Sequence, residues 1–201
     1  KIQSSDIDIA SEKTNNQMVA VLFTDIQGFT TISENLSSDD VIQLLSEYQD
    51  KMIKPIFQNS GTVDKFIGDA VMANFGTPKS YGNDAQNAFD CAKKMKSMLH
   101  EWNKNRNDNR QKVIEHRIGI HYGECIVGNV GGEKRVEYTV LGDTVNVASR
   151  LCDLSKIFNN DLLISKALYD QIEIVEEYEE FDSHPIKGRK EKIDLIRVFL
   201  D

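Results

Sequence analysis

The 201-residue sequence has few cysteines, no long apolar run and a deficit of positive charge. Its three cysteines, Cys91, Cys125 and Cys152, are scattered and odd in number, which excludes a disulfide framework or zinc spacing and favours a reducing compartment. The longest apolar run, from Met18 to Phe23, has six residues, whereas a membrane-spanning helix needs about 20. With 24 Lys and Arg against 32 Asp and Glu, the net charge of −8 argues against nucleic acid as a partner. We therefore expect a cytoplasmic domain, whose parent protein could still be attached to a membrane.

Further absences concern domain organisation. The chain contains no internal repeat and no low-complexity tract, and its length favours one domain. Residues 1–17 are polar without a sustained period, so we expect a linker or ragged N-terminus there and one folded domain over residues 18–201. Because the sequence starts at Lys1 rather than at a methionine, we expect it to be part of a longer protein.

Apolar periodicity predicts alternating strands and helices. The Met18–Phe23 run has the length of a buried strand, and apolar residues three and four apart predict long helices at about 37–59 and 84–103. Two glycine-containing dipeptides, Gly68-Asp69 and Gly123-Glu124, each separate two strand-like runs and predict hairpins. Later elements are strands at 136–141, 162–164 and 193–200 and a helix at 143–158.

The opening order β-α-β-β-α-β predicts an α+β fold with a ferredoxin-like core and additional C-terminal strands and helices. The alternative is a parallel doubly wound sheet. It is disfavoured because the first hairpin has no helix between its strands.

Asp25 and Asp69 each lie where an apolar strand gives way to a turn that contains glycine. Two carboxylates at strand ends can hold hard divalent cations such as Mg²⁺, and a pair of such cations promotes phosphoryl displacement. The alternative is that each aspartate only caps its own turn, which is the commoner role of such a residue. The presence of an aspartate at both of two corresponding strand ends weakens this alternative but does not remove it.

Two nearby features suit phosphate groups. Gly28, Phe29 and Thr30 could begin a helical turn whose free N–H groups form an anion site. Asn146 and Arg150 are four residues apart on a predicted helix, so they share a face from which negative charge in a transition state could be stabilised. Taken singly, the segment at Gly28 could also be a plain connection between a strand and a helix. Asn146 could equally be a residue of the helix N-terminus, and Arg150 a solvated arginine.

Two lysines stand out from their surroundings. Lys65 lies in an apolar strand, where its ammonium group must reach solvent or an acceptor such as a base edge. Lys187 belongs to the basic tetrapeptide KGRK in an otherwise acidic chain, which could meet phosphates or simply form a turn.

Taken in order, four motifs resemble those of the class III nucleotidyl cyclases, which make cyclic AMP or cyclic GMP. The motifs are Phe23–Thr30 (FTDIQGFT), Asp64–Val71 (DKFIGDAV), Arg117–Gly123 (RIGIHYG) and Glu137–Arg150 (EYTVLGDTVNVASR). The resemblance extends from about Val19 to Phe199. Four ordered motifs at suitable distances are far more specific than any one of them alone.

The resemblance implies two Mg²⁺ or Mn²⁺ ions per active site, bound by Asp25 and Asp69 with help from the Ile26 carbonyl. The 3′-hydroxyl of the nucleotide would attack its own α-phosphate, and pyrophosphate would leave. In this scheme one metal ion activates the hydroxyl and the other neutralises the triphosphate, so that no side-chain base is required.

The resemblance also assigns the remaining site residues. Asn146 would orient the ribose, and Arg150 would stabilise charge near the α-phosphate. Lys187 is similar to the phosphate-binding lysine of the family, and a looser alignment places Arg135 near a phosphate or another anion.

Lys65 and Thr139 occupy the two positions that select the base in this family. Adenylate cyclases have Lys with Asp or Thr there, whereas guanylate cyclases typically have Glu and Cys. A lysine ammonium has only donors, which suits adenine N1 and not guanine N1–H, and Thr139 can accept from the adenine 6-amino group. The resemblance therefore implies an adenylate cyclase of the Lys/Thr subgroup that acts on ATP.

Family members work as head-to-tail dimers with shared sites. The resemblance implies a homodimer in which one chain supplies Asp25 and Asp69, and the other supplies Lys65, Thr139 and the helix carrying Asn146 and Arg150. The parent protein is expected to carry an upstream regulatory domain.

Three alternatives remain at this point. The chain could be a guanylate cyclase, or a catalytically silent cyclase-like module that only dimerises and regulates. Silent modules usually lose one of the metal aspartates or the Asn or Arg, whereas Asp25, Asp69, Asn146 and Arg150 are all present. A diguanylate-type cyclase lacks support because the chain has no Gly-Gly-Asp-Glu-Phe turn.

Overall fold

The computed structural model describes residues 14–132, 135–159, 162–185 and 192–200. The strands are β1 (Asn15–Ile26), β2 (Thr62–Ile67), β3 (Ala70–Phe75), β4 (His116–Gly132), β5 (Arg135–Leu141), β6 (Leu162–Ser165), β7 (Tyr178–His184) and β8 (Ile193–Val198). The helices are α1 (Phe29–Ser33), α2 (Ser38–Gln58), α3 (Asp84–Asp108), α4 (Asp143–Leu154), the 3-10 helix η2 (Ser155–Phe158) and α5 (Lys166–Tyr169). In this part of the chain no helix is both long and apolar enough to cross a bilayer.

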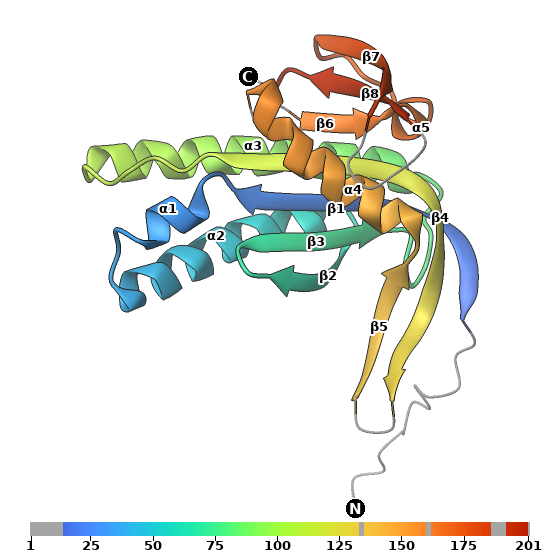
Figure 1. The fold of residues 1–201 in the computed structure, drawn as a ribbon, viewed down its shortest axis with the longest axis horizontal. Coiled ribbons are helices and arrows are strands. Elements are labelled where there is room, and N and C mark those ends of the chain that lie inside the picture. Colours follow the sequence, from blue (N-terminus) through green and yellow to red (C-terminus); the bar gives the residue numbers. More distant parts are fainter. Residues whose placement is uncertain (1–13, 133–134, 160–161, 186–191, 201) are drawn as a thin grey trace, which may run out of the picture.

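The strands form one mixed sheet in the order β2-β3-β1-β4-β6-β8-β7, and β5 pairs with β4 outside this path. The contacts β2–β3, β3–β1 and β1–β4 are antiparallel, and β4–β6 is parallel. The first four strands have the order of a ferredoxin-like core, which confirms the predicted fold class. Figure 1 shows the C-terminal strands β6, β8 and β7 continuing the sheet at the top of the molecule.

The two faces of β1 are covered by different helices because its side chains alternate between them. Ala20 and Leu22 pack in a core with residues of α2 and α3, whereas Val19, Val21 and Phe23 pack with residues of α4. Figure 1 shows α4 crossing in front of the sheet. The end of β1 is therefore held between both layers, which fixes the position of the residues that follow Phe23.

The predicted hairpin at Gly123-Glu124 is wrong. β4 is one continuous strand of 17 residues that pairs with the whole of β1, and Gly123 lies opposite Val19. Two glycines of this strand, Gly119 and Gly123, serve close packing against α4. A Cβ at Gly119 would lie 2.1 Å from the Cys152 nitrogen, and one at Gly123 would lie 2.6 Å from the Thr144 hydroxyl oxygen. The hairpin is instead formed by β4 and β5, which project from the lower right of the sheet in Figure 1.

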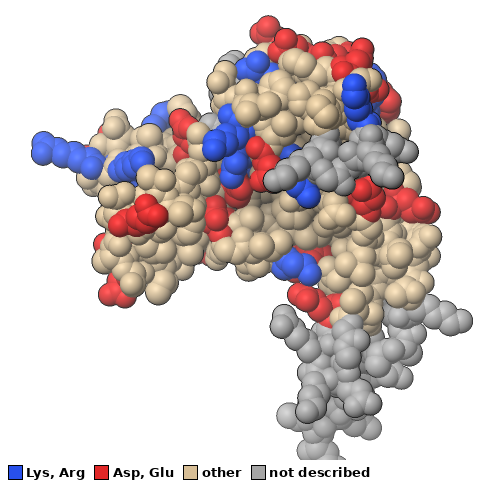
Figure 2. Space-filling view, in the orientation of Figure 1, with Lys and Arg blue, Asp and Glu red and all other residues tan. Residues whose placement is uncertain are grey.

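Several boundaries differ from the sequence prediction. β1 begins at Asn15, within the segment expected to be a linker, because residues 15–17 pair with β4. Helix α3 continues to Asp108, through part of the polar segment after residue 103. The strand β7 was not predicted, since its sequence YEEFDSH is mostly exposed and has only two apolar residues. Figure 2 shows acidic side chains gathered at the top of the molecule, where β7 lies.

Candidate active site

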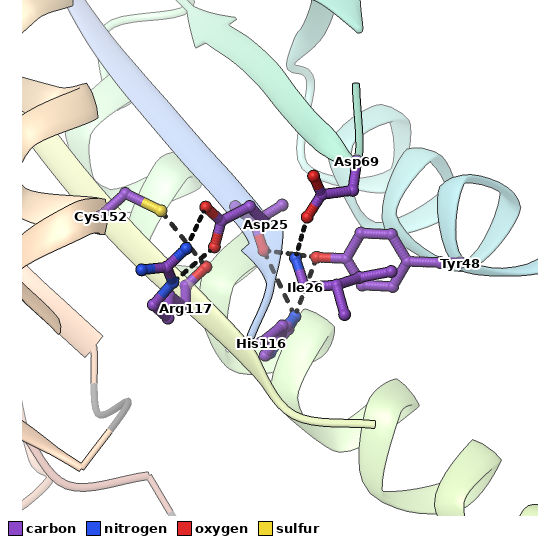
Figure 3. Close-up of polar contacts among 8 residues, drawn as sticks. Asp25, Ile26, Tyr48, Asp69, His116, Arg117 and Cys152 are labelled. Atoms are coloured by element: carbon purple, nitrogen blue, oxygen red, sulfur yellow. Dashed lines mark hydrogen bonds and ion pairs between the residues drawn. The ribbon is translucent and has the colours of Figure 1, made fainter. Parts of the chain in front are cut away.

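The predicted metal aspartates lie next to each other in the structure. Asp25 and Ile26 end β1, and Asp69 follows Gly68 in the turn between β2 and β3. Because β1 and β3 are paired up to Thr24 and Val71, this turn lies beside the end of β1. The Ile26 backbone N–H donates a hydrogen bond to Asp69 Oδ2 at 3.0 Å, as Figure 3 shows.

Arg117 holds the carboxylate of Asp25. The two residues lie opposite each other in the β1–β4 register, and Arg117 donates from Nε at 2.7 Å and from Nη2 at 2.6 Å. Both side chains are 16% exposed. Such a bidentate, partly buried pair is among the stronger charged hydrogen bonds. Figure 3 shows the guanidinium directly against Asp25, on the face where Cys152 of α4 lies.

The environment of Asp25 opposes its negative charge. Burial raises the pKa of the Asp25 carboxyl, Arg117 counteracts this rise, and the charges of Asp69 and Asp153 add to it. Burial alone would lower the pKa of Arg117, but the hydrogen bonds and charge of Asp25 raise it. The cluster thus combines two neighbouring carboxylates with one fixed guanidinium, an arrangement that a further cation would stabilise.

A buried polar triad lies behind this cluster. The Thr24 and Tyr48 hydroxyl groups are 2.8 Å apart, and His116 Nδ1 lies 3.3 Å from the first and 3.4 Å from the second. Thr24 and His116 immediately precede Asp25 and Arg117, and both of their side chains contact Tyr48 of α2. The triad therefore ties the ends of β1 and β4 to α2.

Lys65 and Thr139 also come together, although they lie on strands that are not paired with each other. Both contact Asp64: Thr139 Oγ1 donates to Asp64 Oδ1 at 2.8 Å, and Lys65 Nζ lies 3.4 Å from the same oxygen. This second cluster belongs to β2 and β5. Figure 1 shows β5 at the lower right, whereas β1 ends at the left beside α1, so the two clusters lie apart within one chain.

The other predicted residues are placed as follows. Asn146 and Arg150 share a face of α4, where the former is exposed and the latter half-buried. Gly28 has a φ of 65° and precedes the short helix α1, which starts with Phe29 and Thr30. Two predicted phosphate contacts lie outside the described part: the side chain of Arg135, which begins β5, and the whole of Lys187.

Two cavities lie near the first cluster. One of about 310 Å³ is lined by Gly28, Thr31 and Glu115 among others, and one of about 530 Å³ lies between α1, α2 and the end of α3. Asp25, Asp69, Lys65 and Thr139 line neither of them.

The donor set at Asp25 and Asp69 fits a hard divalent cation that also binds a substrate. Mg²⁺ is commonly held by one or two carboxylates, completed by substrate phosphates and water. The described residues contain no group of three or more His, Cys, Asp or Glu able to hold a metal alone. Each oxygen of Asp25 already accepts one hydrogen bond from Arg117, so a cation at Asp25 would share these oxygens with the guanidinium.

Two residues of these clusters were given no role by the sequence analysis. Arg117 and Asp64 were each noted only as the first residue of a motif. The signal available was a charged residue inside an apolar strand, the same signal that drew attention to Lys65.

Comparison with known proteins shows to which family the chain belongs. Residues 11–197 match the family described as the adenylate and guanylate cyclase catalytic domain. Adenylate cyclase 1 of Rhizobium meliloti is 36% identical over 182 residues, which are 90% of this chain and 27% of that protein. The chain therefore spans about a quarter of the length of that relative.

Solved structures give the same result. The adenylyl cyclase CyaB from P. aeruginosa is 32% identical with a TM-score of 0.81, and 94% of this chain and 96% of that chain are covered. The guanylyl cyclase Cya2 is 30% identical with a TM-score of 0.82, and the coverage is 93% and 94%. The chain belongs to the family of adenylate and guanylate cyclase catalytic domains.

Proposed function

We propose that this chain is an adenylate cyclase that converts ATP into 3′,5′-cyclic AMP and pyrophosphate at sites shared between two copies. The observation that carries the proposal is the hydrogen bond from the Ile26 backbone to Asp69, which places Asp69 beside Asp25 and its partner Arg117. Relatives named adenylate cyclase and the Lys65 and Thr139 pair support ATP as the substrate.

Asp25, Asp69 and the Ile26 carbonyl would hold two Mg²⁺ or Mn²⁺ ions, which would activate the 3′-hydroxyl and neutralise the triphosphate. If a cation replaced Arg117 as the partner of Asp25, the planar fork of the guanidinium would become available to phosphate oxygens. From α4, Asn146 and Arg150 would hold the ribose and stabilise charge on the reacting phosphate. Holding the ribose and phosphate in line lowers the barrier by orientation.

A second copy is needed because the two clusters lie apart in one chain. Large apolar side chains are exposed on the strands that carry or flank the second cluster: Met18, Phe66, Ile67, Ile126, Val130 and Leu141. An apolar surface of this kind is typical of a face covered by a partner. A head-to-tail homodimer would cover it and bring Asp25 and Asp69 of one chain to Lys65 and Thr139 of the other. A regulatory domain joined to the chain would act on the geometry of this dimer.

The test is pyrophosphate release from ATP with Mn²⁺, with GTP measured in parallel. Wild type should turn over ATP in preference to GTP, and Asp69→Ala should lower the rate by on the order of a hundredfold or more. The matched control is Asp182→Ala, which removes an exposed acid from β7 and should keep the wild-type rate. A GTP preference would show a guanylate cyclase, as the likeness to Cya2 allows. No turnover of either nucleotide by folded wild type would show a silent module.

A further inference from the structure

Asp64 lies at the centre of the second cluster. Its side chain is 1% exposed. Four donors surround its carboxylate: the Thr139 hydroxyl at 2.8 and 3.0 Å, the Asn74 amide at 3.2 Å, the Val140 N–H at 3.3 Å and the Lys65 ammonium at 3.4 Å. A buried carboxylate would be costly without such partners, so this convergence fixes the position of each donor.

The position of Asp64 in the sheet explains how it reaches these groups. β2 pairs with β3, and β5 pairs with β4, so no ladder joins β2 to β5. The β2–β3 register shifts between Val63 and Lys65, which places Asp64 at a bulge. A bulge redirects side chains relative to a regular strand. Asp64 and the adjacent Lys65 therefore converge instead of pointing to opposite faces, and Asp64 links the two hairpins.

The direction of the hydrogen bonds decides what Thr139 can offer to a ligand. A hydroxyl has one hydrogen and two lone pairs, whereas a carboxylate only accepts. The hydrogen of Thr139 is directed to both oxygens of Asp64. The lone pairs of Thr139 are therefore left as acceptors toward any base beside it.

Adenine and guanine differ at the atom that would meet this hydroxyl. The 6-substituent is an amino donor in adenine and an oxo acceptor in guanine. An acceptor-only Thr139 matches the first and repels the second. We propose that Asp64 is a positioning residue that holds Thr139 as a hydrogen-bond acceptor, anchors the Lys65 ammonium beside it, and thereby selects ATP over GTP. This inference rests on the proposed cyclase function.

The test is Asp64→Asn, which keeps the size of the side chain but adds an NH₂ donor. Thr139 can then accept from the amide and turn its hydrogen toward the base, so a 6-oxo group becomes acceptable. The ratio of kcat/KM for ATP to that for GTP should fall by about tenfold or more, the effect of about one hydrogen bond. The matched control is Asp84→Asn, the same change at another buried aspartate, which begins α3, accepts from the Tyr81 N–H and should leave the ratio unchanged.

A second variant separates positioning from general damage. In a Thr139→Val background there is no hydroxyl for Asp64 to orient. Adding Asp64→Asn to this variant should therefore change the logarithm of the ATP-to-GTP ratio of kcat/KM by less than half as much as Asp64→Asn changes it in wild type. Full additivity in this cycle, or a ratio unchanged by Asp64→Asn in the folded enzyme, would overturn the role of Asp64. If Asp64→Asn does not fold, Thr139→Ser and Thr139→Val decide: the ratio should survive in the first and fall in the second.

The proposed function fails in a different measurement. Folded wild type without turnover of ATP or GTP would refute cyclase activity itself. Wild type that prefers ATP, together with variants that keep this preference, would refute only the part assigned to Asp64.

Discussion

Acidification should destabilise the folded chain through His116, which is 1% exposed and lies against Thr24 and Tyr48. Burial, together with the charge of Lys96, holds the pKa of this imidazole well below its usual 6.5. In the unfolded chain the same imidazole takes up a proton below about pH 6.5. The unfolded state then binds a proton that the folded state does not, so the free energy of unfolding falls as the pH falls.

The size of the effect follows from the same linkage. Each pH unit below about 6.5 costs about 1.4 kcal/mol for a group that stays neutral when folded, so the contribution between pH 7 and pH 5 is about 2 kcal/mol. That is a sizeable part of the 5–15 kcal/mol by which a typical domain is stable. The loss affects the strand ends that carry Asp25 and Arg117, because the triad ties them to α2.

Urea unfolding at pH 5, 6, 7 and 8 and one protein concentration measures this contribution. Between pH 7 and pH 5, wild type should lose about 2 kcal/mol more than His116→Gln, which has no titrating ring. The control His100→Gln removes an exposed histidine of α3 and should behave as wild type. Equal losses in wild type and His116→Gln would refute the reasoning. An NMR titration of wild type in which His116 becomes protonated near pH 6.5 would do the same.

Two further predictions concern the dimer and the packing of α4. Mixing inactive Asp25→Ala with inactive Arg150→Ala should restore about a quarter of the wild-type rate. The reason is that half of randomly formed dimers are mixed, and each mixed dimer has one intact site of two. A mixture that stays inactive while both variants dimerise would exclude shared sites. Gly119→Ala should lower the free energy of unfolding by about 3 kcal/mol or more in urea titrations, because the new Cβ would lie 2.1 Å from the Cys152 nitrogen. Gly82→Ala, where nothing lies within 4 Å, should cost about 1 kcal/mol, and an equal cost at both positions would contradict this account.

The ferredoxin-like core was predictable because its signals are local. Gly68-Asp69 stands between two apolar runs too close for a crossover helix, and the long helices repeat their apolar residues every three or four positions. The same local rule failed at Gly123-Glu124, where glycine serves contact with Thr144 on α4 and the chain does not turn. Nothing within a few residues of Gly123 distinguishes these two uses of glycine.

The candidate site was predictable in part. Asp25 and Asp69 were recognised from their positions at strand ends, and the structure brings them together. Their partners were not recognised, because contact between Asp25 and Arg117 depends on a register between residues 92 positions apart. Asp64 likewise meets Thr139 only because two hairpins lie side by side. Long-range register of this kind is set by the whole sheet and leaves no mark in a local stretch of sequence.

The hydrogen bond from the Ile26 N–H to Asp69 Oδ2 has a consequence for ligand affinity. It joins residues 43 positions apart in the sequence. Closing a flexible loop of that length costs on the order of 3 kcal/mol of chain entropy. In this fold the cost is met during folding by the β1–β3 pairing. A cation that binds Asp25 and Asp69 therefore does not have to gather its ligands from a mobile loop, and more of its interaction energy remains available as affinity.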